Sequence, residues 1–135
     1  MKTAKLLLST VFVLGFSNVT SAHNYLGTLG TSSSAKDQWY FQCLNPNTKK
    51  ITFQINKTAG SPCVKVTYSS GLNASSCGSW SPTITIATGA GAKFFNITHS
   101  TSGINSYNVN AHCYDKAGLH NPGDQTTPQV YIKNQ

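Results

Sequence analysis

The sequence contains no arginine and no glutamate, so lysine supplies every fixed positive charge and aspartate every acidic side chain. Arginine makes the bidentate contacts through which proteins bind phosphate and guanine, so its absence argues against a nucleic-acid partner. Without glutamate, the paired carboxylates of a glycosidase would have to come from three aspartates. This composition disfavours glycoside hydrolysis by that route.

Long apolar runs are also missing after the first few residues. Lys2 and Lys5 precede an apolar stretch over residues 6–16, which is too short to cross a bilayer. The small residues Thr20 and Ala22 follow it at the positions that signal peptidase reads. This pattern predicts a signal peptide that is cleaved after Ala22, and therefore a secreted or periplasmic protein with no transmembrane segment.

Cleavage would leave 113 of the 135 residues, which is the size of one domain. We expect a signal peptide over residues 1–22, an N-terminal arm over 23–36 and a single domain over 37–135. The arm is rich in serine, threonine and glycine, so it is expected to be either loose or a short edge strand. The domain carries scattered lysines, which indicate a solvated surface.

No long segment has helical periodicity, and alternation of apolar and polar residues dominates after residue 37. The alternating segments predict seven strands, at residues 39–43, 51–56, 64–68, 83–87, 93–98, 107–114 and 129–133. Turns rich in glycine, proline and asparagine separate them. The pattern predicts an all-β fold, a single antiparallel β-sandwich of the jelly-roll or immunoglobulin-like kind, with a barrel as the alternative.

All four cysteines follow the predicted cleavage site. An even number in an exported chain favours two disulfides over metal thiolates. Strand alternation points Cys43 and Cys113 into the core, so we expect them to form a bridge between strands. Cys63 and Cys77 would then close a local loop.

Four segments between residues 37 and 113 combine strand patterns with glycine turns. They are residues 37–41 (DQWYF), 83–86 (TITI), 89–95 (GAGAKFF) and 102–109 (SGINSYNV). In this order they resemble the pre-peptidase C-terminal domain, a secreted bacterial β-sandwich with a jelly-roll-like arrangement. The resemblance implies a module that accompanies secreted enzymes, and it carries over no catalytic residue. The segments 111–113, 118–121 and 134–135 are also similar to small uncharacterised secreted proteins of Gram-negative bacteria.

The predicted cleavage would make His23 the N-terminal residue of the mature chain. Its α-amine and imidazole form a pair that chelates Cu(II), and a second histidine would complete the site. His112, facing solvent on a strand, and His120, in the loop that follows, are the preferred partners, whereas His99 and Asp115 are weaker ones. The arrangement resembles the histidine brace of lytic polysaccharide monooxygenases and the site of periplasmic copper carriers. The alternative interpretation is that these histidines are ordinary surface residues.

Calcium is a less favoured cofactor hypothesis. Asp115, Asp124 and the carbonyl groups near residues 121–123 would supply oxygen ligands. The alternative is that these aspartates form turns through side-chain bonds to the backbone, and that Asp37 opens the first strand in the same way.

Four aromatic residues are expected to be at least partly exposed: Tyr40, Trp80, Tyr114 and Tyr131. Exposed aromatic rings flanked by asparagine and glutamine are typical of carbohydrate-binding or protein-binding surfaces. The alternative is that Trp80 covers the loop at Cys77 and that the tyrosines lie on unremarkable strand faces.

Signals of catalysis are weak. The sequence has no Gly-x-Ser-x-Gly motif and no recognisable Ser, His and Asp arrangement, and the cysteines are expected to be oxidised. We therefore predict a non-catalytic exported module that recognises a carbohydrate or protein partner. The alternative function is a copper-binding protein that uses His23 with His112 or His120, for which copper-dependent oxidase chemistry stays open.

Overall fold

The computed structural model describes residues 24–61, 63–69, 71–99 and 101–135. These ranges contain nine strands, β1 (Tyr25–Leu29), β2 (Lys36–Cys43), β3 (Thr48–Ala59), β4 (Val64–Tyr68), β5 (Asn73–Ser76), β6 (Ile84–Ala87), β7 (Gly91–His99), β8 (Asn105–Asp115) and β9 (Gln129–Asn134). One 3-10 turn, η1 (Pro122–Asp124), lies between β8 and β9. The predicted signal peptide and His23 lie outside the described residues.

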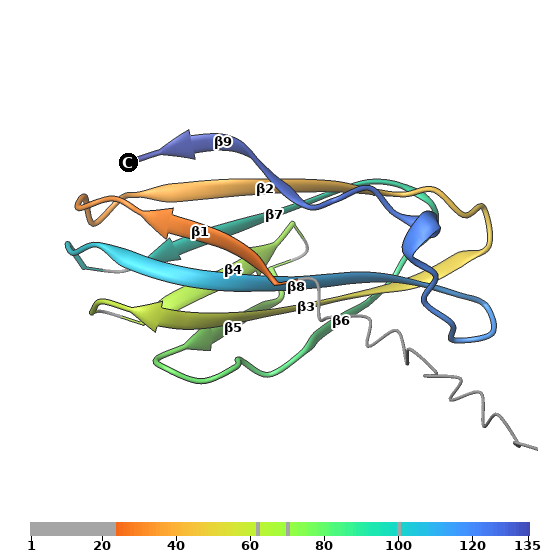
Figure 1. Ribbon diagram of the computed structural model, residues 1–135, viewed down its shortest axis with the longest axis horizontal. Helices are drawn as coiled ribbons and strands as arrows, with labels where there is room; N and C mark the ends of the chain where they lie inside the picture. Colours follow the sequence, from red (N-terminus) through yellow and green to blue (C-terminus); the bar gives the residue numbers. More distant parts are fainter. Residues whose placement is uncertain (1–23, 62, 70, 100) are drawn as a thin grey trace, which may run out of the picture.

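The strands form two antiparallel sheets, which confirms the predicted β-sandwich (Figure 1). The four-stranded sheet has the order β1-β8-β3-β6, and the five-stranded sheet has the order β5-β4-β7-β2-β9. Side chains alternate between the core and the outside along β2 and β8, as a half-buried strand requires. Each sheet therefore presents one outer face, and these two faces carry the candidate sites.

Two strands exceed the seven that the sequence predicts. β1 lies within the predicted N-terminal arm, which is expected to be either loose or a short edge strand. It is an edge strand, because it pairs with β8, with Tyr25 opposite Val109 and Leu29 opposite Asn105. β5 lies within the loop closed by Cys63 and Cys77 and pairs with β4. Its sequence, NASS, contains too little apolar surface to give an alternating pattern.

The core between the sheets contains a group of packed aromatic rings. Phe53 of β3 packs on Phe95 of β7 at 4.8 Å between ring centroids, and Phe41 of β2 contacts both rings at 6.3 and 6.0 Å. Full burial of such a side chain stabilises the fold by roughly 1.5–3 kcal/mol. These residues come from both sheets, so their packing joins the two layers.

Both predicted disulfides are present. Cys43 of β2 bonds Cys113 of β8, with 5.7 Å between Cα atoms, and so links the five-stranded to the four-stranded sheet. Cys63 and Cys77 bond each other at 4.3 Å and close a local loop around β4 and β5. The inward direction expected for Cys43 and Cys113 is confirmed, since both are buried.

The expectation that Asp37 opens a strand by bonding to the backbone is wrong. Asp37 lies inside β2 with no exposed surface, and its carboxylate accepts hydrogen bonds from the Tyr107 hydroxyl and, at 2.9 Å, from Gln135 Nε2. Lys133 Nζ lies 3.6 Å away, and Trp39 Nε1 donates to the Tyr107 oxygen at 2.9 Å. A buried carboxylate needs such partners.

The same network alters the ionisation of Tyr107. Burial, together with the hydrogen bond to Asp37 and the charge of Asp37, raises the pKa of the Tyr107 phenol well above its usual range. Tyr107 belongs to β8 and Asp37 to β2, so the hydrogen bond between the phenol and the carboxyl group connects the two sheets through the core.

Candidate functional site

The outer face of the five-stranded sheet carries three aromatic side chains in mutual contact, Tyr40 of β2, Phe94 of β7 and Tyr131 of β9, here named the aromatic cluster. The distances between ring centroids are 5.1 Å for Tyr40 and Phe94, 6.1 Å for Tyr40 and Tyr131, and 5.8 Å for Phe94 and Tyr131. Phe94 is 39% exposed and Tyr131 is 64% exposed. Three separate strands thus bring apolar rings to one exposed point.

Strand register explains how the cluster forms. Tyr40 lies directly opposite Phe94 in the antiparallel pair of β2 and β7, where facing side chains are in reach of each other. Between β2 and β9 the register shifts by one residue, because Gln38 pairs with Ile132 whereas Trp39 pairs with Val130. Tyr131 is the extra residue of this irregularity, and a bulge of this kind redirects a side chain.

Amide side chains flank the aromatic cluster on the same face. Gln38 and Gln42 follow the alternation of Tyr40 on β2, and Asn96 follows that of Phe94 on β7. Asn96 lies opposite Gln38, and its Oδ1 has no hydrogen-bond partner among the residues that the structure describes. The face therefore offers apolar rings and neutral hydrogen-bonding groups next to one another.

The structure brings together two of the four predicted aromatic residues, Tyr40 and Tyr131, and adds Phe94. The two remaining residues lie elsewhere: Trp80 forms an isolated bridge with Asn56 and is 38% exposed, and Tyr114 belongs to β8 in the other sheet. Alternation along β7 could have identified Phe94, because it points outward while its neighbour Phe95 points into the core. Two adjacent phenylalanines hide this alternation.

The outer face of the four-stranded sheet carries a second cluster, made of His112, Tyr114 and His120 and here named the histidine cluster. The ring centroids of His112 and His120 lie 4.4 Å apart, and Tyr114 is 6.1 Å from His112 and 5.8 Å from His120. Lys50 Nζ lies 4.7 Å from the centre of the Tyr114 ring. The two histidines that the sequence offers as alternative partners of His23 thus contact each other.

A shallow pocket of about 190 Å³ adjoins the histidine cluster. It is lined by Thr52, Phe53, Gln54, Thr83, Asn110, His112 and Tyr114. The Oδ1 atom of Asn110 is buried and has no hydrogen-bond partner within the described part of the chain. Polar groups therefore converge beside the histidine cluster as well.

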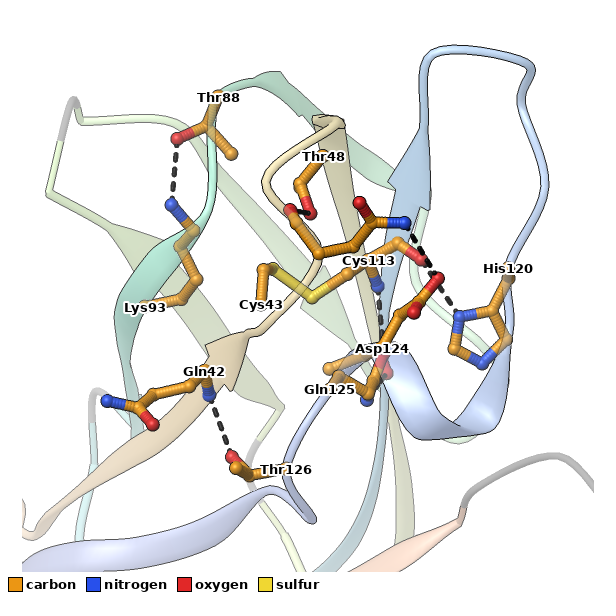
Figure 2. The surroundings of a disulfide bond; sticks show 12 residues. Gln42, Cys43, Thr48, Thr88, Lys93, Cys113, His120, Asp124, Gln125 and Thr126 are labelled. Carbon is orange, nitrogen blue, oxygen red and sulfur yellow. Dashed lines mark hydrogen bonds between the residues drawn. A yellow bond between two sulfur atoms is a disulfide. The ribbon is translucent and has the colours of Figure 1, made fainter.

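The segment after β8 folds back along that strand and positions His120 (Figure 2). The Gln125 side chain accepts a hydrogen bond from the Cys113 amide at 2.8 Å and donates one to the Ala111 carbonyl at 3.1 Å. His120 Nδ1 lies 2.9 Å from the Cys113 carbonyl. β1 pairs with β8 only as far as Val109, so these side chains supply the hydrogen bonds that a longer strand would make.

The aspartates of the calcium hypothesis make turn contacts. Asp115 Oδ1 accepts hydrogen bonds from the amides of Ala117 and Leu119, each at 2.9 Å. Asp124 Oδ2 accepts from the side-chain amides of Asn45 and Asn121, each at 3.2 Å. The Asp115 contacts agree with the turn-forming alternative, because their donors are backbone amides, whereas the Asp124 donors are side chains. Calcium binding stays a prediction.

His99 is buried away from the other histidines. Its Nδ1 lies 2.6 Å from Asn105 Oδ1, and its Nε2 lies 2.6 Å from the Ser32 carbonyl. Among the described residues, no group of three or more His, Cys, Asp or Glu side chains is arranged to hold a metal ion. The described chain therefore contributes a pair of imidazoles, and His23 is not described.

No protein-family model matches this chain, and no curated protein matches it either. The resemblance to the pre-peptidase C-terminal domain therefore stays a prediction. In the described residues, no helix is both long and apolar enough to cross a membrane.

Proposed function

We propose that this protein is an exported, non-catalytic recognition module that binds neutral carbohydrate through the aromatic cluster. The observation that carries the proposal is the convergence of Tyr40, Phe94 and Tyr131 on the outer face of the five-stranded sheet. Exposed rings in contact with one another form a ready apolar surface for a ligand.

The chemistry around the cluster favours a sugar over a charged partner. The C–H face of a sugar ring packs on an aromatic ring, and its hydroxyls exchange hydrogen bonds with neutral amides. Gln38, Gln42 and Asn96 provide such amides within two residues of the rings. A protein partner that uses the same rings is the competing outcome.

Export is part of this proposal. The described cysteines are all paired, and disulfides persist in oxidising compartments such as the periplasm or the extracellular space. The predicted signal peptide agrees with this location. Carbohydrate polymers of cell walls and envelopes are found in the same compartments.

The test is retention of the purified mature protein on insoluble polysaccharides, together with a glycan array. We expect binding that falls about tenfold or more in Phe94→Ala and Tyr131→Ala, since aromatic contacts are each worth roughly 0.5–1.5 kcal/mol beyond their buried area. Tyr114→Ala is the matched control, because it removes an aromatic ring from the opposite face. Absence of retention, or equal retention by the variants of the aromatic cluster, would contradict the proposal.

A second candidate function is copper binding, in which His23 acts with His112 or His120. The contact of the His112 and His120 rings at 4.4 Å favours it. The test is mass spectrometry of the mature N-terminus followed by titration with Cu(II). If His23→Ala binds Cu(II) as tightly as the wild type, His23 is not the main ligand.

A further inference from the structure

We infer that His112 and His120 form the core of a site for a divalent transition-metal ion, with Cu(II) as the favoured ion. The inference deepens the second candidate function, on which it rests, because it assigns the metal to two side chains of the folded domain.

The spacing of the two rings suits a shared ion. Bonds from imidazole nitrogen to a metal ion are about 2.0–2.1 Å long, so two nitrogens on one ion lie roughly 3–4 Å apart. Ring centroids 4.4 Å apart, with planes inclined by 74°, allow one nitrogen of each ring to approach a common point.

The hydrogen bond of His120 selects the tautomer that a metal site needs. The Cys113 carbonyl can only accept a hydrogen bond, so Nδ1 of His120, 2.9 Å away, carries the proton (Figure 2). In the neutral ring the lone pair is then on Nε2. Metal-bound histidines commonly donate their other N–H to a backbone carbonyl in this way, which fixes the ring orientation.

The backbone beneath the site is held rigidly. Gln125 bonds to both Ala111 and Cys113, the two residues that flank His112. Cys113 is also tied to Cys43 by the disulfide between the sheets. The two imidazoles therefore start close to their bound arrangement, which lowers the entropic cost of binding.

The available ligands favour Cu(II) among the divalent metals. The four cysteines are paired as two disulfides, so soft thiolates do not compete for the site. Imidazole nitrogen suits copper, nickel and zinc, and the affinity of such ligands is highest for Cu(II). Hard cations such as Ca²⁺ prefer oxygen and should not bind here.

The experiment uses mature, metal-free wild-type protein titrated with Cu(II), followed by calorimetry and electron paramagnetic resonance. We expect His112→Asn and His120→Asn each to weaken Cu(II) binding at least tenfold and to remove imidazole nitrogen couplings from the spectrum. Asn108→Ala, on the same strand face but outside the pocket beside the histidine cluster, is the control and should bind as the wild type does. An excess of Ca²⁺ should neither displace Cu(II) nor change the imidazole couplings, because Ca²⁺ prefers oxygen ligands.

The outcomes separate the inference from the function on which it rests. If His112→Asn and His120→Asn lose binding but His23→Ala keeps it, the inference holds and the N-terminal ligand is wrong. If only His23→Ala loses binding, copper binding stands and the inference is overturned. If the wild type does not bind Cu(II), both fail.

A measurement on the wild type covers the case in which a histidine variant does not fold. Diethyl pyrocarbonate modifies accessible imidazoles, and mass spectrometry locates the modified residues. The Nε2 atom of His120 is buried, so the reagent should modify His112 first. Cu(II) should protect His112 at one equivalent, and unchanged modification of His112 in the presence of Cu(II) would overturn the inference.

Discussion

The two outer faces of the sandwich are built in different ways. On the five-stranded sheet, Tyr40 and Phe94 face each other across β2 and β7, and the irregular pairing of β2 with β9 brings Tyr131 to them. On the four-stranded sheet, His112 stands on β8, but His120 comes from the segment after that strand and is held by the Cys113 carbonyl. The aromatic cluster depends on sheet pairing, whereas the histidine cluster depends on a folded-back segment.

The two clusters should therefore be disrupted by different substitutions. A site formed by register survives as long as the sheet survives, because neighbouring strands fix it. A site formed by a folded-back segment depends on the few contacts that hold the segment, here Gln125 and the disulfide at Cys113. Changes to these contacts should affect the histidine cluster more than the aromatic cluster.

The largest expected effect comes from removing the disulfide between the sheets. Cys43 and Cys113 are 70 residues apart and Cys63 and Cys77 are 14 apart, so loop entropy predicts losses of roughly 4 and 3 kcal/mol, respectively. Urea unfolding of the two double Cys→Ala variants measures these values. The first variant should also lose Cu(II) affinity while keeping carbohydrate retention, and the second is the control. If the first variant lost Cu(II) affinity and carbohydrate retention equally, the two faces would not differ in the way proposed.

The next largest effect concerns the buried link between the sheets. Tyr107→Phe removes the hydrogen bond to Asp37 and the acceptor for Trp39, and should destabilise the fold by roughly 1–3 kcal/mol because buried polar groups lose their partners. Tyr114→Phe, on the outer face, is the control and should change stability little. Urea unfolding at pH 8 measures both.

The pH dependence of this link has a definite sign. The pKa of Tyr107 is raised in the folded state, so its stabilising contribution is complete below the unfolded value of about 10 and is lost as the pH rises above that value. Wild-type stability should therefore fall between pH 10 and 11 more steeply than that of Tyr107→Phe. Burial lowers the pKa of Lys93, and this shift makes stability rise with pH. Lys93 is present in both the wild type and Tyr107→Phe, so it does not affect the comparison of their slopes. Equal slopes would show that Tyr107 does not cause the loss.

The smallest expected effect on stability is that of Tyr131→Ala. Tyr131 is mostly exposed on an edge strand, so its removal should change the free energy of unfolding by no more than about 0.5 kcal/mol. Carbohydrate retention should nevertheless fall. Thermal unfolding alongside the polysaccharide assay checks this separation, and a large loss of stability would mean that the ring serves the fold.

The sequence was sufficient for the parts of the fold that follow from alternation. It predicted the sandwich, both disulfides and the inward faces of the strands that carry Cys43 and Cys113. It did not predict β5, whose four residues are small and mostly polar. It also did not predict the burial of Asp37, because a carboxylate at the start of an apolar segment usually stays at the surface. Asp37 bonds to Tyr107 and Gln135, and both residues are far from it in the sequence.

The candidate sites were predictable only in part. Residue types and exposure indicated Tyr40, Tyr131, His112 and His120, but not that they form two clusters on opposite faces. The bulge that turns Tyr131 toward Phe94 is a property of strand pairing between β2 and β9, and no local pattern encodes it.

Nuclear magnetic resonance of isotope-labelled mature protein shows whether each outer face binds its own ligand. A soluble oligosaccharide from a retained polysaccharide should shift the signals of Tyr40, Phe94 and Tyr131 and leave those of His112 and His120 unchanged. Paramagnetic Cu(II) should broaden the signals of His112 and His120 and spare the aromatic cluster. Shifts from the oligosaccharide on the histidine cluster, or no shifts on the aromatic cluster, would contradict the claim.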